Sequence, residues 1–292
     1  MRAKLAAAIL DASPDWSAFA ATRAMGAAAK ATLPRGVTRT AIAAYQRYFD
    51  VDLSDVDPAL MEAGFDSFDE FFTRPLRPGA RPVDPDARVW VSPCDGALRD
   101  SRRIEPETPI RAKGHDFTLE QLLGDGDIVE AFVGGLATTI YLHPRDYHRV
   151  HSPCAGVPSY VRAIPGRLLP VTDAAVERDA SLFAKNERNV HLLDTEHGRV
   201  AVVMVAAFGV GHMSCSYGDI PAHPTQVETR HFDGEVELEK GGELGMFHLG
   251  STVILVTPKG WALDTVWRIA LDAGEMPTLR MGEKLLVRRR DG

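Results

Sequence analysis

The chain has 292 residues, of which 45% are hydrophobic and 25% are charged, as is ordinary for a folded globular protein. Its formal net charge of −7 argues against nucleic acid as a partner. The three cysteines include no Cys-x-x-Cys pair, which argues against a disulfide framework. No segment reaches the ~18 consecutive apolar residues of a membrane-spanning helix.

The first 63 residues are predicted to form a helical region with an unusual charge. Residues 1–49 carry seven Lys or Arg against two Asp, a net charge of +5, so the rest of the chain carries −12. In residues 38–49, Ile42, Tyr45 and Phe49 recur at helical spacing. The pattern leaves two interpretations open: a helical subdomain packed on the core, or amphipathic helices that dock on an anionic phospholipid membrane.

The remaining residues, 64–292, are predicted to form a β-rich domain. Ser67 and Glu70 have the spacing of a helix cap, and a second helix is expected at residues 118–123. Short apolar segments separated by Gly and Pro predict strands. They are residues 89–91, 128–133, 137–142, 156–164, 190–193, 200–208, 235–238 and 251–256. The predicted fold class is α+β, with the β-rich domain a mainly antiparallel sandwich or flattened barrel.

Three distant segments carry side chains suited to acyl chemistry. Ser92-Pro93-Cys94-Asp95-Gly96 places an aspartate at a tight turn, and residues 142–154 hold three histidines, among them His148 and His151. Leu249-Gly250-Ser251-Thr252 places a serine directly after a glycine. An aspartate, a histidine and a serine far apart in sequence are typical of a relay whose members meet in space.

These motifs resemble those of the phosphatidylserine decarboxylases, pyruvoyl-dependent, self-processing enzymes associated with bacterial membranes. Phe71-Phe72-Thr73-Arg74-Pro75-Leu76 and Lys113-Gly114-His115 resemble further segments of this family. The resemblance implies cleavage between Gly250 and Ser251, which leaves a large chain (1–250) and a small chain (251–292) as partners. It also implies that Ser251 becomes the cofactor, a covalent pyruvoyl group derived from the serine.

Chemistry and the family resemblance together give each candidate residue an expected role. His151 is the expected base for the Ser251 hydroxyl, and Asp95 is expected to orient that histidine. Gly250 lacks a Cβ and is expected to allow a strained backbone and a close approach of the hydroxyl. The resemblance implies that His148 lies in the substrate pocket, where it would give a proton to the carbanion left by CO₂.

The resemblance also implies the reaction and its location. The pyruvoyl ketone would form a Schiff base with the amine of phosphatidylserine and yield phosphatidylethanolamine and CO₂, a step of phospholipid biosynthesis. The expected location is the cytoplasmic side of the cell membrane, with peripheral attachment. No metal site is expected, because Cys94 and Cys154 do not have a zinc-ligand spacing with the histidines.

Three other functions stay open at this point. A pyruvoyl decarboxylase of soluble amino acids fits the motifs, but the basic, aromatic-bearing N-terminal region argues against it. A serine hydrolase would keep the relay of Asp95, His151 and Ser251 intact, although Ser251 lacks a Gly-x-Ser-x-Gly elbow. A non-enzymatic β-rich binding module would make the motifs a coincidence. A denaturing gel with two bands, split near residue 250, would eliminate the last two.

Overall fold

The fold is given by a computed structural model. It describes residues 15–105, 110–112, 115–171, 175, 176, 179, 181–209 and 212–289, with the backbone alone for residues 15–19, 110–112, 115, 116 and 251. Lys113 and Gly114 of the predicted Lys-Gly-His motif lie outside the described residues.

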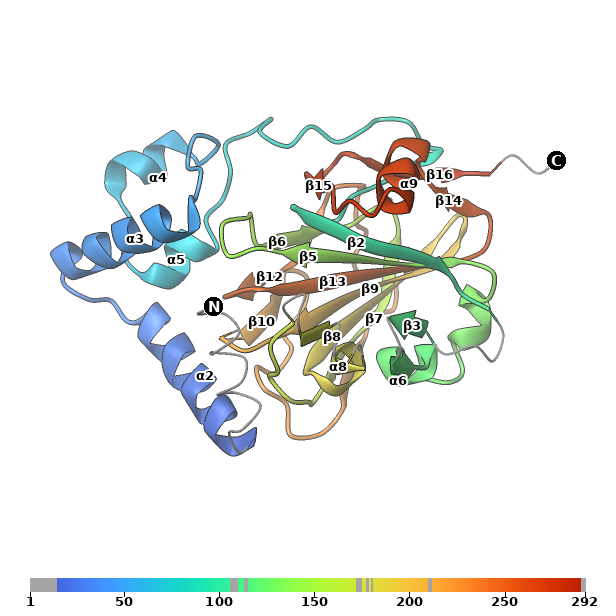
Figure 1. Ribbon diagram of the computed structural model, residues 1–292, viewed down its shortest axis with the longest axis horizontal. Coiled ribbons are helices and arrows are strands. Elements are labelled where there is room, and N and C mark those ends of the chain that lie inside the picture. The colour runs from blue at the N-terminus through green and yellow to red at the C-terminus, as the bar shows by residue number, and fades with distance from the viewer. Residues whose placement is uncertain are drawn as a thin grey trace.

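Helices make up most of the chain before Arg74 and gather at one end of the molecule (Figure 1). They are α2 (Asp15–Lys30), α3 (Arg35–Phe49), α4 (Pro58–Ala63) and α5 (Phe68–Phe72). The predicted helix at residues 38–49 is confirmed as part of α3, and Ser67 caps α5 by accepting a hydrogen bond from the Glu70 amide. Tyr45 packs edge-on against Phe71 and Phe72, which joins α3 to α5.

The strands follow from Val89 onward. They are β1 (Val89–Val91), β2 (Gly96–Arg103), β3 (Ile110–Ala112), β4 (His115–Phe117), β5 (Leu136–Leu142), β6 (Arg149–His151), β7 (Val157–Ile164), β8 (Arg188–Thr195), β9 (Gly198–Ala206), β10 (His212–Cys215), β11 (Glu228–His231), β12 (Glu243–His248), β13 (Ser251–Thr257), β14 (Trp261–Leu263), β15 (Thr278–Leu279) and β16 (Lys284–Arg288). The helical segments among them are α6 (Leu119–Leu123), η1 (Val129–Phe132), α8 (Leu182–Lys185) and α9 (Thr265–Asp272).

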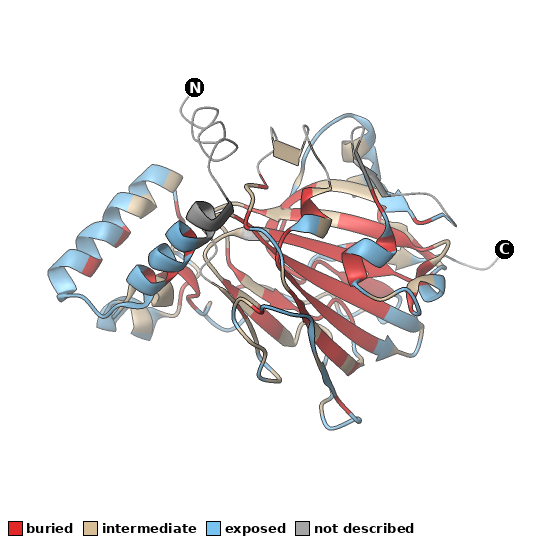
Figure 2. Ribbon diagram, turned by 90° about the horizontal axis from the view of Figure 1, so that it is seen from below, coloured by how far each residue is buried: buried red, intermediate tan, exposed pale blue. Residues whose placement is uncertain are grey.

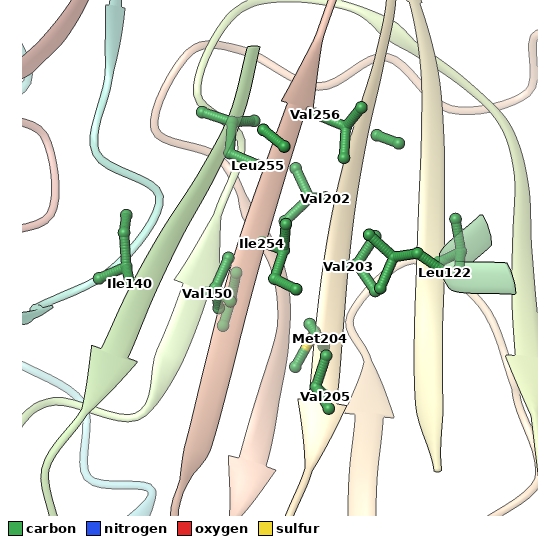
Figure 3. Packing of buried hydrophobic residues seen from close by; sticks show 14 of the residues in the cluster. Leu122, Ile140, Val150, Val202, Val203, Met204, Val205, Ile254, Leu255 and Val256 are labelled. Carbon is green, nitrogen blue, oxygen red and sulfur yellow. The ribbon is translucent and has the colours of Figure 1, made fainter. Parts of the chain in front are cut away.

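An eight-stranded antiparallel sheet is the centre of the fold, with the order β11-β7-β8-β9-β13-β5-β2-β15. Strand β13 is hydrogen-bonded on both sides, to β9 and to β5. Its residues Val253, Leu255 and Val256 are fully buried, which explains the continuous apolar run in the sequence. Figure 3 shows side chains of β5, β9 and β13 packed together, and Figure 2 shows how completely these strands are buried.

Two smaller sheets adjoin the large one. One has the order β10-β12-β6, and the other has the order β1-β16-β14. In Figure 1 the first of them lies at the end of β13 that faces the helices. The chain passes from β12 to β13 through Leu249 and Gly250 alone, so these two residues link the small sheet to the large one.

The observed architecture confirms the predicted α+β class with its large antiparallel sheet. In the part of the chain that the structure describes, this sheet is open, because its edge strands β11 and β15 pair with different neighbours. Two predicted strands are wrong. Residues 128–133 contain the 3₁₀ helix η1, and in residues 235–238 only Leu238 makes a bridge, to Gly156. Residues 128–133 are wrongly predicted because a short apolar run has no periodicity that separates a strand from a buried helical turn.

Candidate active site

The large sheet brings Asp95 and Ser251 to the same end of β5. Asp95 directly precedes β2, which pairs Ala97 with Tyr141, and Ser251 opens β13 opposite Leu142. Neighbouring strands lie about 4.8 Å apart, so strands β2 and β13 are separated by about 10 Å with β5 between them.

His151 reaches this place through a pair of similar turns. Its amide donates to the Pro93 carbonyl at 2.7 Å, and the Val91 amide donates to the Pro153 carbonyl at 3.0 Å. The turns Ser92-Pro93-Cys94 and Ser152-Pro153-Cys154 share the same internal bond, from the serine hydroxyl to the cysteine carbonyl. The turn that leads to Asp95 therefore lies against the strand that carries His151.

Strand β12 runs beside β6. Its first residue, Glu243, pairs with His151, and near its other end the Phe247 amide donates to the His148 carbonyl. That other end leads through Leu249 and Gly250 into Ser251. The three segments lie at the same end of the large sheet, beside helix α5 (Figure 1), with His148 nearer than His151 to Ser251 along β12. Their side chains, however, have partners that the sequence did not suggest.

Asp95 is held by an arginine. The Arg81 guanidinium donates from Nε to Oδ1 at 2.9 Å and from Nη2 to Oδ2 at 2.6 Å, and the Met281 amide also donates to Oδ1. Arg81 reaches Asp55 as well, at 2.8 Å. Burial lowers the pKa of Arg81, but its bonds to Asp95 and Asp55 outweigh that effect and raise it above its ordinary value. No hydrogen bond joins Asp95 to His151 among the described contacts.

The buried His151 is oriented by a carbonyl instead. Its Nδ1 lies 2.8 Å from the Gly241 oxygen, and its Nε2 lies 3.0 Å from the Tyr147 hydroxyl. A carbonyl can only accept, so we assign the proton to Nδ1, and Nε2 then accepts from Tyr147. Burial lowers the pKa of His151, so the ring is neutral at pH 7. His151 therefore has the protonation state of a base, and the lone pair on its Nε2 accepts the hydrogen bond from the Tyr147 hydroxyl.

His148 is fully buried between the helices and the sheet. Its ring stacks on Phe72 with centroids 4.1 Å apart, and its Nε2 donates to the His143 carbonyl at 3.0 Å. Its Nδ1 is buried without a hydrogen-bond partner. Burial lowers the pKa of His148 to about 3. In this state Nδ1 is an acceptor, so His148 must first take up a proton there before it can donate one.

Comparison with known proteins identifies the family of this chain. The sequence model of phosphatidylserine decarboxylase matches residues 68–287. The chain belongs to the phosphatidylserine decarboxylase family. It is thereby a carboxy-lyase, and its family acts in phospholipid biosynthesis.

Several relatives support this assignment over most of the chain. A phosphatidylserine decarboxylase proenzyme of Myxococcus xanthus is 38% identical, over 90% of this chain and 92% of its own length. Proenzymes of the same name from Anaeromyxobacter sp. and Azotobacter vinelandii are 42% and 41% identical, over 83% and 90% of this chain and 86% and 92% of their own lengths.

The structure also reveals residues around the site that the sequence alone does not indicate. Arg81 lies in a proline-rich connector, and nothing in the sequence pairs it with Asp95. Tyr147 lies inside the histidine segment, and nothing in the sequence distinguishes it as a partner of His151. His248 directly precedes Leu249, and its Nδ1 lies 2.8 Å from both carboxylate oxygens of Asp69. For these three residues, the one signal in the sequence is the position of His248 directly before the cleavage motif.

The expectation about Gly250 can be compared with the backbone geometry. The left-handed residue before Ser251 is Leu249, with φ of 85°, whereas Gly250 has no positive φ. A Cβ added to Gly250 would meet nothing within 4 Å. The expectation that Gly250 carries the strained backbone is therefore wrong for this structure.

Proposed function

We propose that this chain is a self-processing phosphatidylserine decarboxylase that cleaves itself between Gly250 and Ser251. The observation that supports the proposal is that the segments carrying Asp95, His151 and Ser251, more than fifty residues apart in the sequence, lie at the same end of β5. The proenzyme names of the relatives support it.

In the proposed cleavage, Ser251 Oγ attacks the Gly250 carbonyl carbon, and its proton passes to His151 Nε2. The C–N bond breaks and an ester forms, with the amine of residue 251 set free. Elimination from Cα and Cβ then releases the Gly250 carboxylate. Water replaces the nitrogen of residue 251, so one water is consumed, one ammonia leaves and a pyruvoyl group remains on the small chain.

The residues present fit a pyruvoyl group at this position. Ser251 opens a strand that is hydrogen-bonded on both sides, so the new chain end would stay at the end of the sheet after the cut. A pyruvoyl carbonyl there supplies an electrophile that accepts the electron pair released with CO₂. The buried His148 Nδ1, without a partner in this structure, would be the nearby acceptor that takes up and returns the proton.

The proposed substrate is phosphatidylserine and the proposed product is phosphatidylethanolamine. Residues 1–63 are proposed to dock on an anionic phospholipid membrane on the cytoplasmic side. Large apolar side chains are exposed there, among them Leu33, Val37 and Tyr48, and Arg35 and Arg39 are exposed beside them. Figure 2 shows how much of these helices is exposed. No helix in the described part of the chain is long and apolar enough to span a bilayer.

A cavity in the same helices supports docking. It has a volume of about 490 Å³ and lies between one face of α3 and the end of α4. Arg35 and Arg39 line one part of it, and Ile42, Leu53 and Phe65 line another. Guanidinium groups beside apolar side chains suit the phosphate and the upper acyl chain of a phospholipid.

The decisive test is a denaturing gel of the purified protein with intact masses of the bands. We expect fragments of residues 1–250 and 251–292, the smaller one blocked at its N-terminus. The matched variant Ser251→Ala should stay whole and inactive. A single whole chain whose Ser251 reacts with a fluorophosphonate would favour the serine hydrolase. A free N-terminal serine on the small fragment would refute pyruvoyl formation.

A further inference from the structure

The backbone just before the proposed cleavage point is strained. Leu249 has φ of 85°, a left-handed conformation that costs an L-residue free energy because its Cβ crowds the backbone. It is one of three non-glycine residues with positive φ in the described chain, the others being Asp50 and His223. Such strain persists only where the surroundings fix the chain on both sides.

Downstream of Leu249, the sheet fixes the chain. Ser251 pairs with Leu142 on one side and with Ala206 on the other, so the start of β13 cannot turn to relieve the strain.

Upstream, His248 fixes the chain through its ring. Its Nδ1 is bonded to both oxygens of Asp69, and its Nε2 lies 3.2 Å from the Ser214 hydroxyl. The ring also stacks on His212, with centroids 3.6 Å apart. Asp69 sits in α5, whose Phe71 and Phe72 are almost completely buried, so the carboxylate is anchored in the fold.

We propose that Asp69 and His248 form a clamp that holds Leu249 in its left-handed conformation and thereby accelerates self-cleavage. Both are positioning residues, because they act through the backbone of Leu249 and not on the reacting atoms. This inference rests on the proposed self-cleavage. Breaking the bond between Gly250 and Ser251 separates the two fixed points, so the strain is released as the reaction proceeds. Whatever part is released at the transition state raises the rate.

The test compares Leu249→Gly with Leu249→Ala, because the two variants differ only by the Cβ that causes the strain. Cell-free synthesis followed by a chase on denaturing gels gives the first-order rate of cleavage of the full chain. Glycine adopts positive φ freely, so Leu249→Gly should cleave at least fivefold more slowly. Alanine retains the strain, so Leu249→Ala should cleave within twofold of the unaltered chain. Equal rates for the glycine and alanine variants would overturn the proposal.

A second comparison separates strain from simple loosening of the chain. Asp69→Ala should slow cleavage at least fivefold when residue 249 is leucine, and less than twofold when it is glycine. Asp69→Asn, which still accepts a hydrogen bond, should recover part of the rate. If Asp69→Ala slows both backgrounds equally, Asp69 has a merely structural role and the clamp is refuted.

Asp50→Gly is the matched control for strain elsewhere. Asp50 has φ of 56° at the end of α3, far along the chain from Ser251. The substitution should leave the cleavage rate unchanged. In an uncleavable Ser251→Ala background, Leu249→Gly should raise the unfolding temperature and Leu249→Ala should not. Failure of the unaltered chain to cleave at all would instead refute the proposed function.

Discussion

The ion pair between Arg81 and Asp95 allows a quantitative prediction, with Arg81→Met as the perturbation. Both side chains are nearly buried, with 11% and 10% of their surfaces exposed. Removing Arg81 leaves the Asp95 carboxylate with the Met281 amide as its remaining described donor. Loss of one partner from a buried ion pair costs about 3–5 kcal/mol. For a domain of this size that lowers the unfolding temperature by about 6–20 °C.

The assay is thermal unfolding followed by circular dichroism, with every variant in the Ser251→Ala background so that all chains are whole. Arg77→Met is the matched control, because the Arg77 side chain is 49% exposed and its pair with Asp55 should contribute at most about 1 kcal/mol. Adding Asp95→Asn to Arg81→Met removes the unpaired charge and should restore much of the lost stability. If Arg81→Met is no worse than Arg77→Met, the reasoning about the buried pair is wrong.

Three further predictions concern the histidines. Tyr147→Phe removes the donor from His151 Nε2 and frees its lone pair, so cleavage on a gel should be at least as fast as in the unaltered chain; a slower reaction would mean that Tyr147 relays the proton. His148→Ala should still yield two fragments but lose about 10²–10⁴-fold in CO₂ release measured on the same sample, whereas near-normal turnover would remove His148 from the mechanism. Burial lowers the pKa of His148 and of His191 to about 3, below the unfolded value of about 6.5. The unfolded chain therefore binds more protons between these values, and stability should fall as the pH drops from 6.5 towards 3, by about 1.4 kcal/mol per pH unit for each histidine. Urea unfolding of the Ser251→Ala chain at several pH values measures this slope, and His191→Gln should make it shallower unless His191 is already charged in the fold.

The elements that the sequence predicted well are those with local signals. Helix α3 has its apolar residues at helical spacing, α6 has the capping pair Thr118 and Gln121, and β13 is a long apolar run. The small sheet β10-β12-β6 is not indicated by the sequence, because its strands are short and its β12–β6 pairing joins residues about a hundred positions apart. Such pairing depends on the whole fold rather than on local propensity.

The candidate site, too, could be predicted only in part from the sequence. Motifs identified the segments of Asp95, His151 and Ser251, and the sheet brings those segments together. The hydrogen-bond partners were beyond prediction. Arg81, Gly241 and Tyr147 take the places that a simple relay would give to its own members. A side chain's partner is a property of three-dimensional packing, which one sequence without coordinates does not contain.

The placement of residues 251–289 in the fold has a consequence for the proposed self-cleavage. Strand β13 lies between β9 and β5, β15 is added to the edge at β2, and β16 pairs with β1. The C-terminal segment therefore pairs with strands of the rest of the molecule at three separate places. Once the connecting peptide bond is cut, pulling this segment out would require breaking both sheets. A denatured, processed enzyme would have to reassemble from two independent pieces at a rate that depends on their concentration. The intact chain closes the same contacts within one molecule. Under the proposed processing, the covalent link would be needed only during folding, and the strand pairing would hold the two pieces together afterwards.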